Sequence, residues 1–341
     1  MGTDEELQAT IRDLVQDGKG ILAADESLPT IRKRFQAIGV EPSEENRRAY
    51  RSLLLTAPGL GACLSGVILF EETLAQRADD GTPLPKAAER QGIVPGVKVD
   101  KGTVPLANAP GDLITQGLDA LADRLKTYKA QGARFAKWRE VYPITDRNPT
   151  GLGIAANAEM LARYAAACQA EAMVPVVEPE VLLDGDHSLQ RCAEVTEAVL
   201  CAVFEALHRH KVVLEWMLLK PSMVVAGKDC AHKAGPEEVA RESIKVLQRT
   251  VPAAVPSLNF LSGGQSPTQA TANLNAMNLL FPQAPWKLSF SYARALQQPV
   301  LDAWQGRREN APAAQAALLL RAKLTAAACK GQYRPEMEPA R

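Results

Sequence analysis

The sequence predicts an α/β protein whose parallel strands close into a TIM (β/α)8 barrel, with extra helices at both ends of the chain. Short apolar runs alternate with amphipathic helical segments, and there are eight such runs. The connections between them are long enough for crossover helices. A length of 341 residues with 46% hydrophobic content suits a single barrel domain over residues 1–341.

The predicted strands are short apolar segments, many of them ending in charged or glycine-rich residues. The sixth is the most informative, because a mostly apolar run ends directly in Lys220 and Pro221. The predicted strands are residues 20–24, 66–70, 94–99, 135–141, 174–177, 212–219, 255–261 and 287–292.

Helical periodicity separates most of these strands. Apolar residues from Ile114 to Tyr128 are spaced by four and three residues, which predicts a helix ahead of the strand at 135. Ser266 followed by Pro267 is typical of a helix start. We also expect helices outside the barrel at residues 4–15, 43–55 and 313–329.

Composition excludes several classes of protein. Lys+Arg and Asp+Glu balance at 39 each, which gives no global charge for binding nucleic acid or an anionic membrane. No apolar run approaches the roughly 18 residues of a membrane span. The six cysteines are scattered and predict reduced thiols. The acidic N-terminus lacks a signal core, so we expect a cytoplasmic protein.

Charged and polar residues stand at the carboxyl ends of most predicted strands. In such a barrel these ends converge on one mouth, which carries the active site. Any one of them alone reads as a solvated strand end, but their repetition on several strands predicts a site. The residues are Asp25, Lys98, Lys137, Arg139, Glu178, Glu180, Lys220, Ser262, Gly263, Ser291 and Arg294.

Lys220 is the candidate nucleophile of this site. Burial at a strand end lowers the pKa of an amine and leaves part of it neutral, and a neutral amine attacks carbonyl groups. The alternative for this stretch alone is a lysine that reaches solvent. Histidine-based metal binding is poorly supported, because none of the four histidines falls at a strand end. Magnesium held only by carboxylates stays open.

Two stretches predict anion binding. Ser262-Gly263-Gly264 offers backbone N–H groups ahead of a helix start, and Arg294 follows the last strand. Barrel enzymes often bind phosphate with the loops after strands seven and eight. A second candidate site is Thr30 with Arg34, after the first strand.

Long ordered motifs then give the chain a family resemblance. They include GKGILAADES (18–27), GVKVDKG (96–102), FAKWR (135–139), VPVVEPEVLLDGDH (174–187), LLKPSMV (218–224), FLSGGQS (260–266) and SYARALQ (291–297). The chain resembles the class I fructose-bisphosphate aldolases over nearly its whole length. The resemblance implies reversible, metal-independent cleavage of fructose 1,6-bisphosphate to dihydroxyacetone phosphate and glyceraldehyde 3-phosphate, without a cofactor, in glycolysis and gluconeogenesis.

The resemblance also implies catalytic roles. Lys220 matches the lysine that forms a Schiff base with the ketose, and Glu178 matches the acid/base that moves protons during cleavage. Asp25, Lys137 and Glu180 match residues that orient the lysine and support its charge. The family's usual tetramer predicts a homotetramer.

Substrate contacts carry over in the same way. Lys98 and Arg139 match cationic contacts to the substrate and its distal phosphate. Ser262, Gly263 and Arg294 match the other phosphate site.

Three departures from the family pattern stand out. Ala293 replaces a glycine, and a positive φ there would cost alanine about 1 kcal/mol. Thr30 stands where many members have serine. The chain lacks the long tail that ends in tyrosine, so residues 331–341 are expected to be a short flexible tail and 334–341 to be dispensable for proton exchange. The tail end and Ala293 suggest a bacterial type.

Other functions remain as alternatives. The same chemistry on another phosphorylated ketose is one. A metal-dependent barrel lyase or isomerase is another, disfavoured by the few histidines. A scaffold protein on a retained aldolase fold would be expected to have lost its catalytic charges, and the sequence keeps them.

Overall fold

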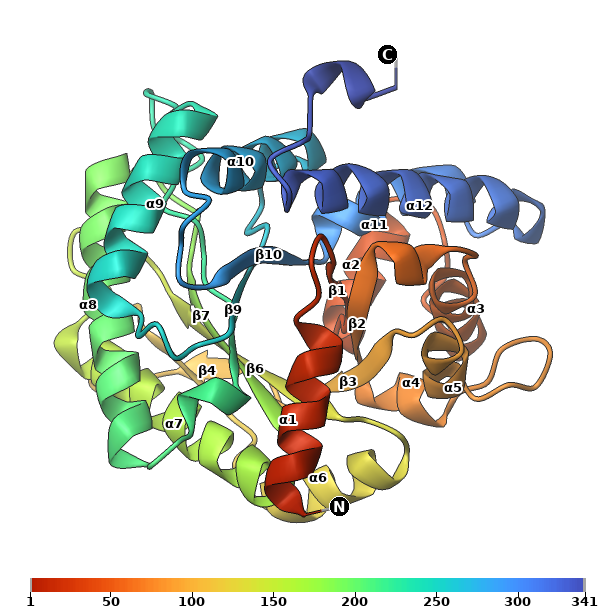
Figure 1. The fold of residues 1–341 in the computed structure, drawn as a ribbon, viewed down its shortest axis with the longest axis horizontal. Helices are drawn as coiled ribbons and strands as arrows, with labels where there is room; N and C mark the ends of the chain where they lie inside the picture. The colour runs from red at the N-terminus through yellow and green to blue at the C-terminus, as the bar shows by residue number, and fades with distance from the viewer. Residues whose placement is uncertain (1, 340–341) are drawn as a thin grey trace.

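The computed structural model describes residues 2–339 and contains a closed barrel of eight parallel strands (Figure 1). The strands follow one another around the barrel in the order β1-β10-β9-β8-β7-β6-β3-β2. This confirms the predicted fold class. The strands are β1 Gly20–Ala24, β2 Leu64–Leu69, β3 Val94–Lys98, β6 Phe135–Tyr142, β7 Val174–Val181, β8 Leu218–Leu219, β9 Ser257–Phe260 and β10 Lys287–Tyr292.

Helices surround the barrel, and the extra helices predicted at both ends of the chain are present (Figure 1). Several begin at a hydroxyl side chain that accepts a bond from a backbone N–H, as Ser266 does from Gln269 at 3.2 Å. The helices are α1 Thr3–Leu14, α2 Leu28–Gln36, α3 Glu44–Leu55, α4 Glu71–Ala75, α5 Leu84–Glu89, α6 Leu121–Ala130, α7 Gly151–Ala170, α8 Leu189–Arg209, α9 Pro236–Thr250, α10 Pro267–Leu280, α11 Arg294–Trp304 and α12 Ala311–Ala328.

The interior of the barrel is apolar at one end and polar at the other. Helix α1 lies across the apolar end, where its Leu7 and Leu14 join a buried cluster with Val94 and Phe135 at the strand starts. A Cβ at Gly96 would lie 2.4 Å from the Phe135 ring, so only glycine leaves room for that ring. The charged side chains that line the cavity lie toward the carboxyl ends of the strands.

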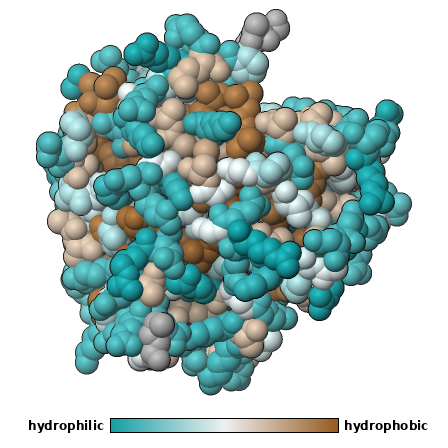
Figure 2. All heavy atoms as spheres, turned by 45° about the vertical axis from the view of Figure 1, so that its right-hand side comes forward, coloured by the Kyte–Doolittle hydropathy of each residue, from teal (hydrophilic) through white to brown (hydrophobic). Residues whose placement is uncertain are grey.

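The surface gives no sign of a membrane span. No helix within residues 2–339 combines the length and apolar character needed to cross a bilayer. The face drawn in Figure 2 is largely hydrophilic, with separate apolar patches between the polar side chains.

The predicted helix beginning near Ile114 is wrong in its first part. Ile114 lies in β5 (Leu113–Thr115), which pairs antiparallel with β4 (Thr103–Pro105). Helix α6 begins only at Leu121, after Ala120 adopts a left-handed φ of 52°. The apolar residues from Leu121 to Tyr128 belong to this helix, whereas Ile114 belongs to the β4–β5 hairpin.

The sixth strand is shorter than predicted. Residues Leu214–Trp216 form a 3-10 turn, and β8 is only Leu218–Leu219. The side chain of Gln169 on α7 accepts from Val213 N at 2.9 Å and donates to its carbonyl at 2.8 Å. These bonds satisfy the backbone of Val213 in place of a strand neighbour.

The described part of the C-terminal tail contacts the helices. Arg321 on α12, only 4% exposed, binds both carboxylate oxygens of Glu338 at 2.7 and 2.6 Å. It also donates to Thr271 Oγ1 at 2.8 Å, and Tyr333 donates to Glu338 Oε1 at 2.9 Å. Residues 340–341 of the predicted flexible tail lie outside the described part of the chain.

Truncation after Tyr333 is therefore expected to destabilise the protein. It removes Glu338 and leaves the Arg321 guanidinium buried without its carboxylate. Breaking a buried pair costs about 3–5 kcal/mol, and we expect about 1–3 kcal/mol because Glu338 is partly exposed. Urea unfolding measures the difference, with truncation after Glu338 as the control. Equal stability of the two truncated proteins would show that the anchor contributes nothing.

Candidate active site

The carboxyl ends of the strands open into one cavity of about 1090 Å³. Helices α2 and α11 extend its wall through Leu28 and Leu301. All the predicted site residues line it: Asp25, Thr30, Arg34, Lys98, Lys137, Arg139, Glu178, Glu180, Lys220, Ser262, Gly263, Ser291 and Arg294.

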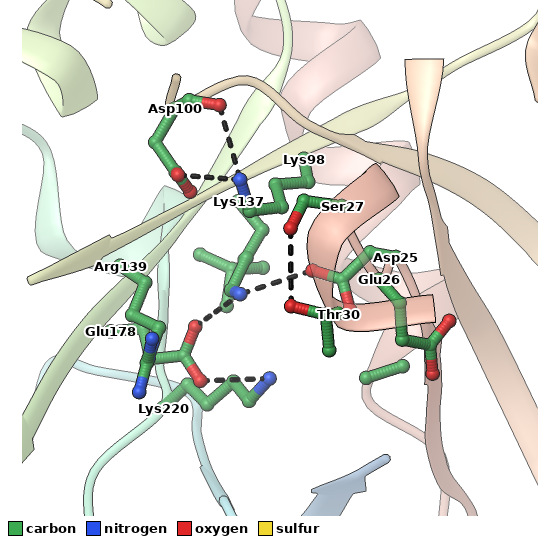
Figure 3. Close-up of polar contacts among 12 residues, drawn as sticks. Asp25, Glu26, Ser27, Thr30, Lys98, Asp100, Lys137, Arg139, Glu178 and Lys220 are labelled. Carbon is green, nitrogen blue, oxygen red and sulfur yellow. Dashed lines mark hydrogen bonds and ion pairs between the residues drawn. The ribbon is translucent and has the colours of Figure 1, made fainter. Parts of the chain in front are cut away.

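Four buried charges form a chain of ion pairs in the cavity (Figure 3). Lys137 Nζ lies 3.0 Å from Asp25 Oδ2 and 2.6 Å from Glu178 Oε2. Lys220 Nζ lies 3.0 Å from Glu178 Oε1. Glu178 therefore bridges the two lysines, one on each carboxylate oxygen.

Strand pairing brings these groups together. Strands β7 and β8 pair at Val177 and Leu219, so the residues that follow, Glu178 and Lys220, lie on adjacent strands at one level. On β6, Lys137 and Arg139 are two residues apart and point to the same face. Residues that are far apart in the chain therefore form one cluster, because alternate side chains of a strand point to the same face.

The two lysines have opposite pKa shifts. Burial lowers the pKa of Lys220; Glu178 opposes this effect, Lys137 adds to it, and the pKa ends below its usual value. Burial acts on Lys137 in the same way, but Asp25 and Glu178 outweigh it and raise its pKa. Lys137 is thus the permanent cation, and Lys220 is the amine that is more easily neutral.

The carboxylates beside them stay ionised. Burial would raise the pKa of Glu178, but Lys137, Lys220 and Arg139 hold it below its usual value. The pKa of Asp25 is likewise lowered by Lys137 and Lys220 against the effect of burial. Glu178 is therefore a base in contact with an amine of lowered pKa, the pairing of unlike pKa values typical of acid–base sites.

The predicted distal cations are held by carboxylates at the rim. Arg139 Nε pairs with Glu180 Oε2, so Glu180 is placed against the arginine and not beside Lys220. Lys98 Nζ lies 2.5 Å from Asp100 Oδ1 (Figure 3). Asp100 follows the end of β3, and its second oxygen is buried without a hydrogen-bond partner among residues 2–339.

The glycine-rich loop after β9 forms another part of the cavity wall. Gly263 and Gly264 have φ values of 52° and 94°, which glycine adopts without strain. A Cβ at Gly264 would lie 3.4 Å from Arg294 Nη2, so the guanidinium lies close to this backbone. Ser291 Oγ is buried there without a partner. Backbone N–H groups and an arginine at a helix start suit an oxyanion.

Ala293 does not require a positive φ. Its φ is −100°, a value that alanine adopts freely, so the strain considered from the sequence does not arise. Ala293 lines the cavity beside Arg294 and packs against the inner apolar cluster.

Helix α2 brings a further group to the rim. Thr30 Oγ1 lies 3.1 Å from Ser27 Oγ (Figure 3), and Arg34 Nη1 lies 2.5 Å from Glu26 Oε1. Glu26 also accepts from Arg51 and Gln297, both at 2.7 Å. Sequence reasoning assigns no role to Glu26, although it directly follows Asp25 at the end of the first strand.

The arrangement suits attack by an amine on a carbonyl group, with proton transfer through the bridging carboxylate. Anion-binding groups stand on both sides of the amine. Within residues 2–339, no three His, Cys, Asp or Glu side chains converge as metal ligands would. A closed barrel with this site belongs to the class of (β/α)8-barrel enzymes built around a buried lysine.

Comparison with known proteins narrows this class. The family model described as "Fructose-bisphosphate aldolase class-I" (Glycolytic) matches residues 6–341. "Fructose-bisphosphate aldolase 6, cytosolic" of Arabidopsis thaliana is 55% identical over 330 residues, 97% of this chain and 92% of that protein. The non-muscle-type aldolase of Lethenteron camtschaticum is 53% identical over 332 residues, 97% and 91% of the two chains.

A solved structure agrees. Fructose-bisphosphate aldolase from Plasmodium falciparum, in complex with TRAP and a small molecule inhibitor, superposes with a TM-score of 0.95 at 50% identity, covering 97% of this chain and 96% of that one. The chain belongs to the class I fructose-bisphosphate aldolase family, and it is a glycolytic aldolase, a carbon–carbon lyase. The curated relatives named above are from a plant and an animal and give the predicted bacterial type no support.

Proposed function

We propose that Lys220 forms the Schiff base through which this enzyme reversibly cleaves fructose 1,6-bisphosphate to dihydroxyacetone phosphate and glyceraldehyde 3-phosphate. The observation that carries this assignment is the opposite shift of two buried lysine pKa values around one carboxylate. Lys137 keeps its proton, while Lys220 is the amine more easily neutral. Only the neutral form attacks a ketone.

Glu178 is proposed to move the protons. Its oxygen 3.0 Å from Lys220 can take a proton from the nitrogen as the amine adds to the ketone. It can then give this proton to the carbinolamine hydroxyl, which leaves as water and gives the iminium. It then takes the proton of the substrate hydroxyl as the carbon–carbon bond breaks. The bond electrons flow into the iminium and form an enamine, while the aldehyde leaves.

The remaining residues are proposed to hold charge and phosphate. Asp25 and Lys137 keep the cluster charged, and Lys137 lowers the pKa of Lys220. Lys98 and Arg139 bind the distal phosphate, and Glu180 orients Arg139. The loop with Ser262 and Gly263 binds the other phosphate, together with Ser291 and Arg294, and Thr30 and Arg34 extend the binding surface at the rim.

Substrate comparison tests the proposal against another phosphorylated ketose. Fructose 1-phosphate lacks the distal phosphate, so kcat/KM is expected to fall at least about ten-fold relative to the bisphosphate, from the loss of charge-assisted contacts. Saturating chelator should leave cleavage of both unchanged. Loss of activity in chelator would favour a metal-dependent lyase instead. An equal kcat/KM for both sugars would reject the distal phosphate site.

We further propose a cytoplasmic homotetramer whose chain forms one barrel domain over residues 1–341. Relatives named as cytosolic support the location. Packing of α1 against the barrel interior and of α12 against α10 and α11 supports a single domain. Light scattering during gel filtration tests the assembly, and a monomer at working concentration would reject it.

A further inference from the structure

Glu140 is a fully buried carboxyl group that the proposed mechanism does not use. It lies on β6 next to Arg139, on the opposite face of the strand, within the outer apolar layer that contains Trp138 and Tyr142. Its Oε1 accepts from Trp138 Nε1 at 2.7 Å, and its Oε2 accepts from the backbone N–H of Thr115 at 3.2 Å. A buried carboxyl held this way requires a structural or functional reason.

Thr115 connects this carboxyl group to the active site through hydrogen bonds. It ends β5, and its Oγ1 donates to the carbonyl oxygen of Arg139 at 2.8 Å. One residue of the hairpin therefore bonds two successive residues of the strand that carries Arg139. The hydrogen bonds of Thr115 fix where this part of β6 lies relative to the hairpin.

The same end of the hairpin lies at the cavity rim, because Thr115 pairs with Thr103. Lys101 N donates to the Gln116 carbonyl at 2.8 Å, and Gln116 N donates to the Gly102 carbonyl at 2.9 Å. Lys101, Gly102 and Thr103 line the cavity. A displacement of the hairpin therefore moves the rim and the backbone of Arg139 together.

We propose that Glu140 is a positioning residue that, through Thr115, holds the hairpin β4–β5 against the strand that carries Arg139. It acts on substrate binding without touching the substrate. The effect on binding rests on the proposed function, since Arg139 is there a contact to the distal phosphate. The contact between Glu140 and Thr115 itself exists in the free protein and is testable without any substrate.

The electrostatic surroundings make this device sensitive to pH. Burial raises the pKa of Glu140 to about 8, against the bonds from Thr115 and Trp138. The titratable neighbours are Asp100 after β3 and Tyr142 on the same strand, while Tyr164 of α7 stacks on Trp138. The cations of this strand, Lys137 and Arg139, pair with other carboxylates.

The sign of the pH effect follows from these contacts. Below about pH 8 the Glu140 carboxyl is protonated and rests in its apolar site. Above that pH it becomes a carboxylate, which accepts the bonds from Thr115 N–H and Trp138 Nε1 more strongly than the protonated acid does. Deprotonation therefore tightens the contact between β6 and the hairpin, and protonation loosens it. Affinity for the distal phosphate should therefore fall as pH drops through 8.

Steady-state kinetics of Glu140→Gln test the effect on binding. The wild-type KM for fructose 1,6-bisphosphate should fall about five- to ten-fold between pH 7 and 9.5, the effect of one strengthened hydrogen bond. Glutamine does not ionise, and its one accepting oxygen cannot serve both donors, Thr115 N–H and Trp138 Nε1. The variant should therefore show the raised KM at every pH. For fructose 1-phosphate, which lacks the distal phosphate, wild type and variant should share one KM.

Two further variants separate positioning from general damage. Thr115→Val removes the bond to the Arg139 carbonyl but keeps the backbone N–H to Glu140. Its KM for the bisphosphate should be raised, with the wild-type dependence on pH retained. Glu237→Gln, an exposed change at the start of α9, should match the wild type. A Glu140→Gln variant that keeps the wild-type pH dependence of KM would overturn the inference.

Amide hydrogen exchange in the free protein gives a readout independent of catalysis. After correction for the intrinsic effect of pH, exchange at Thr115 should slow about ten-fold above pH 8 in the wild type and stay fast at all pH values in Glu140→Gln. If the protein failed to cleave fructose 1,6-bisphosphate, this result would still establish the link between Glu140 and the hairpin. Equal protection of Thr115 in wild type and variant would reject it.

Discussion

Replacing Lys220 by alanine is expected to abolish turnover, with a loss of about 10⁵-fold or more, the size seen when a covalent nucleophile is removed. The reason is that Lys220 is a buried amine whose pKa is lowered, so part of it is neutral and can attack the ketone. Lys137 carries a raised pKa between Asp25 and Glu178, so it stays protonated. Cleavage of fructose 1,6-bisphosphate, followed by release of dihydroxyacetone phosphate, measures the loss.

Borohydride trapping identifies the amine directly. Reduction in the presence of dihydroxyacetone phosphate should leave a covalent adduct on Lys220 and none in Lys220→Ala. Peptide mapping that places the adduct on Lys137 or Lys98 would overturn the assignment. Circular dichroism of the variant checks that the fold survives, because Glu178 keeps its 2.6 Å contact to Lys137 without Lys220.

The barrel is predictable from the sequence because its signal is local. Each strand carries an apolar run, each crossover carries helical periodicity, and the ends at 20–24 and 287–292 match β1 and β10. The carboxyl ends of parallel strands must share one edge, so the charged residues there are predictable as a cluster. The positions of Lys220, Glu178, Lys137 and Asp25 follow from these two rules.

The errors arise where contacts distant in sequence decide the structure. Ile114 is at helical spacing from the apolar residues that follow it, yet the segment from Leu113 to Thr115 pairs with β4 and bonds to β6. Gln169 satisfies the backbone near Val213, which no local pattern reveals. The tail residues are polar, but Glu338 pairs with the buried Arg321 on α12. Nothing in the local sequence predicts this contact.

Partners of the site residues were also beyond sequence reasoning. Glu26 and Asp100 were visible as charges at strand ends, but their pairing with Arg34 and Lys98 depends on side-chain directions. Glu180 was assigned to the lysine by resemblance and is instead placed against Arg139. Glu140 follows Arg139 on β6, so its side chain points away from the mouth of the barrel. A search for charged residues that face the mouth therefore does not find it.

Replacing Glu178 by glutamine is expected to lower turnover by about 10²–10⁴-fold, the usual range for loss of a general acid–base group. Glutamine keeps the size of the side chain but cannot take the hydroxyl proton as the carbon–carbon bond breaks. The cluster should survive, because Lys137 retains Asp25 at 3.0 Å. Single-turnover cleavage of fructose 1,6-bisphosphate measures the step in which the proton is taken.

The same variant should still form the Schiff base, and this separates its role from that of Lys220. The negative charge of Glu178 raises the pKa of Lys220, so its removal leaves more of the amine neutral at a given pH. Borohydride should therefore still trap dihydroxyacetone phosphate on Lys220 in Glu178→Gln, while cleavage is nearly lost. Glu180→Gln serves as the matched control, because Glu180 pairs with Arg139 and its loss should mainly raise KM. An unchanged cleavage rate in Glu178→Gln would move the acid–base role to Asp25 or Glu180.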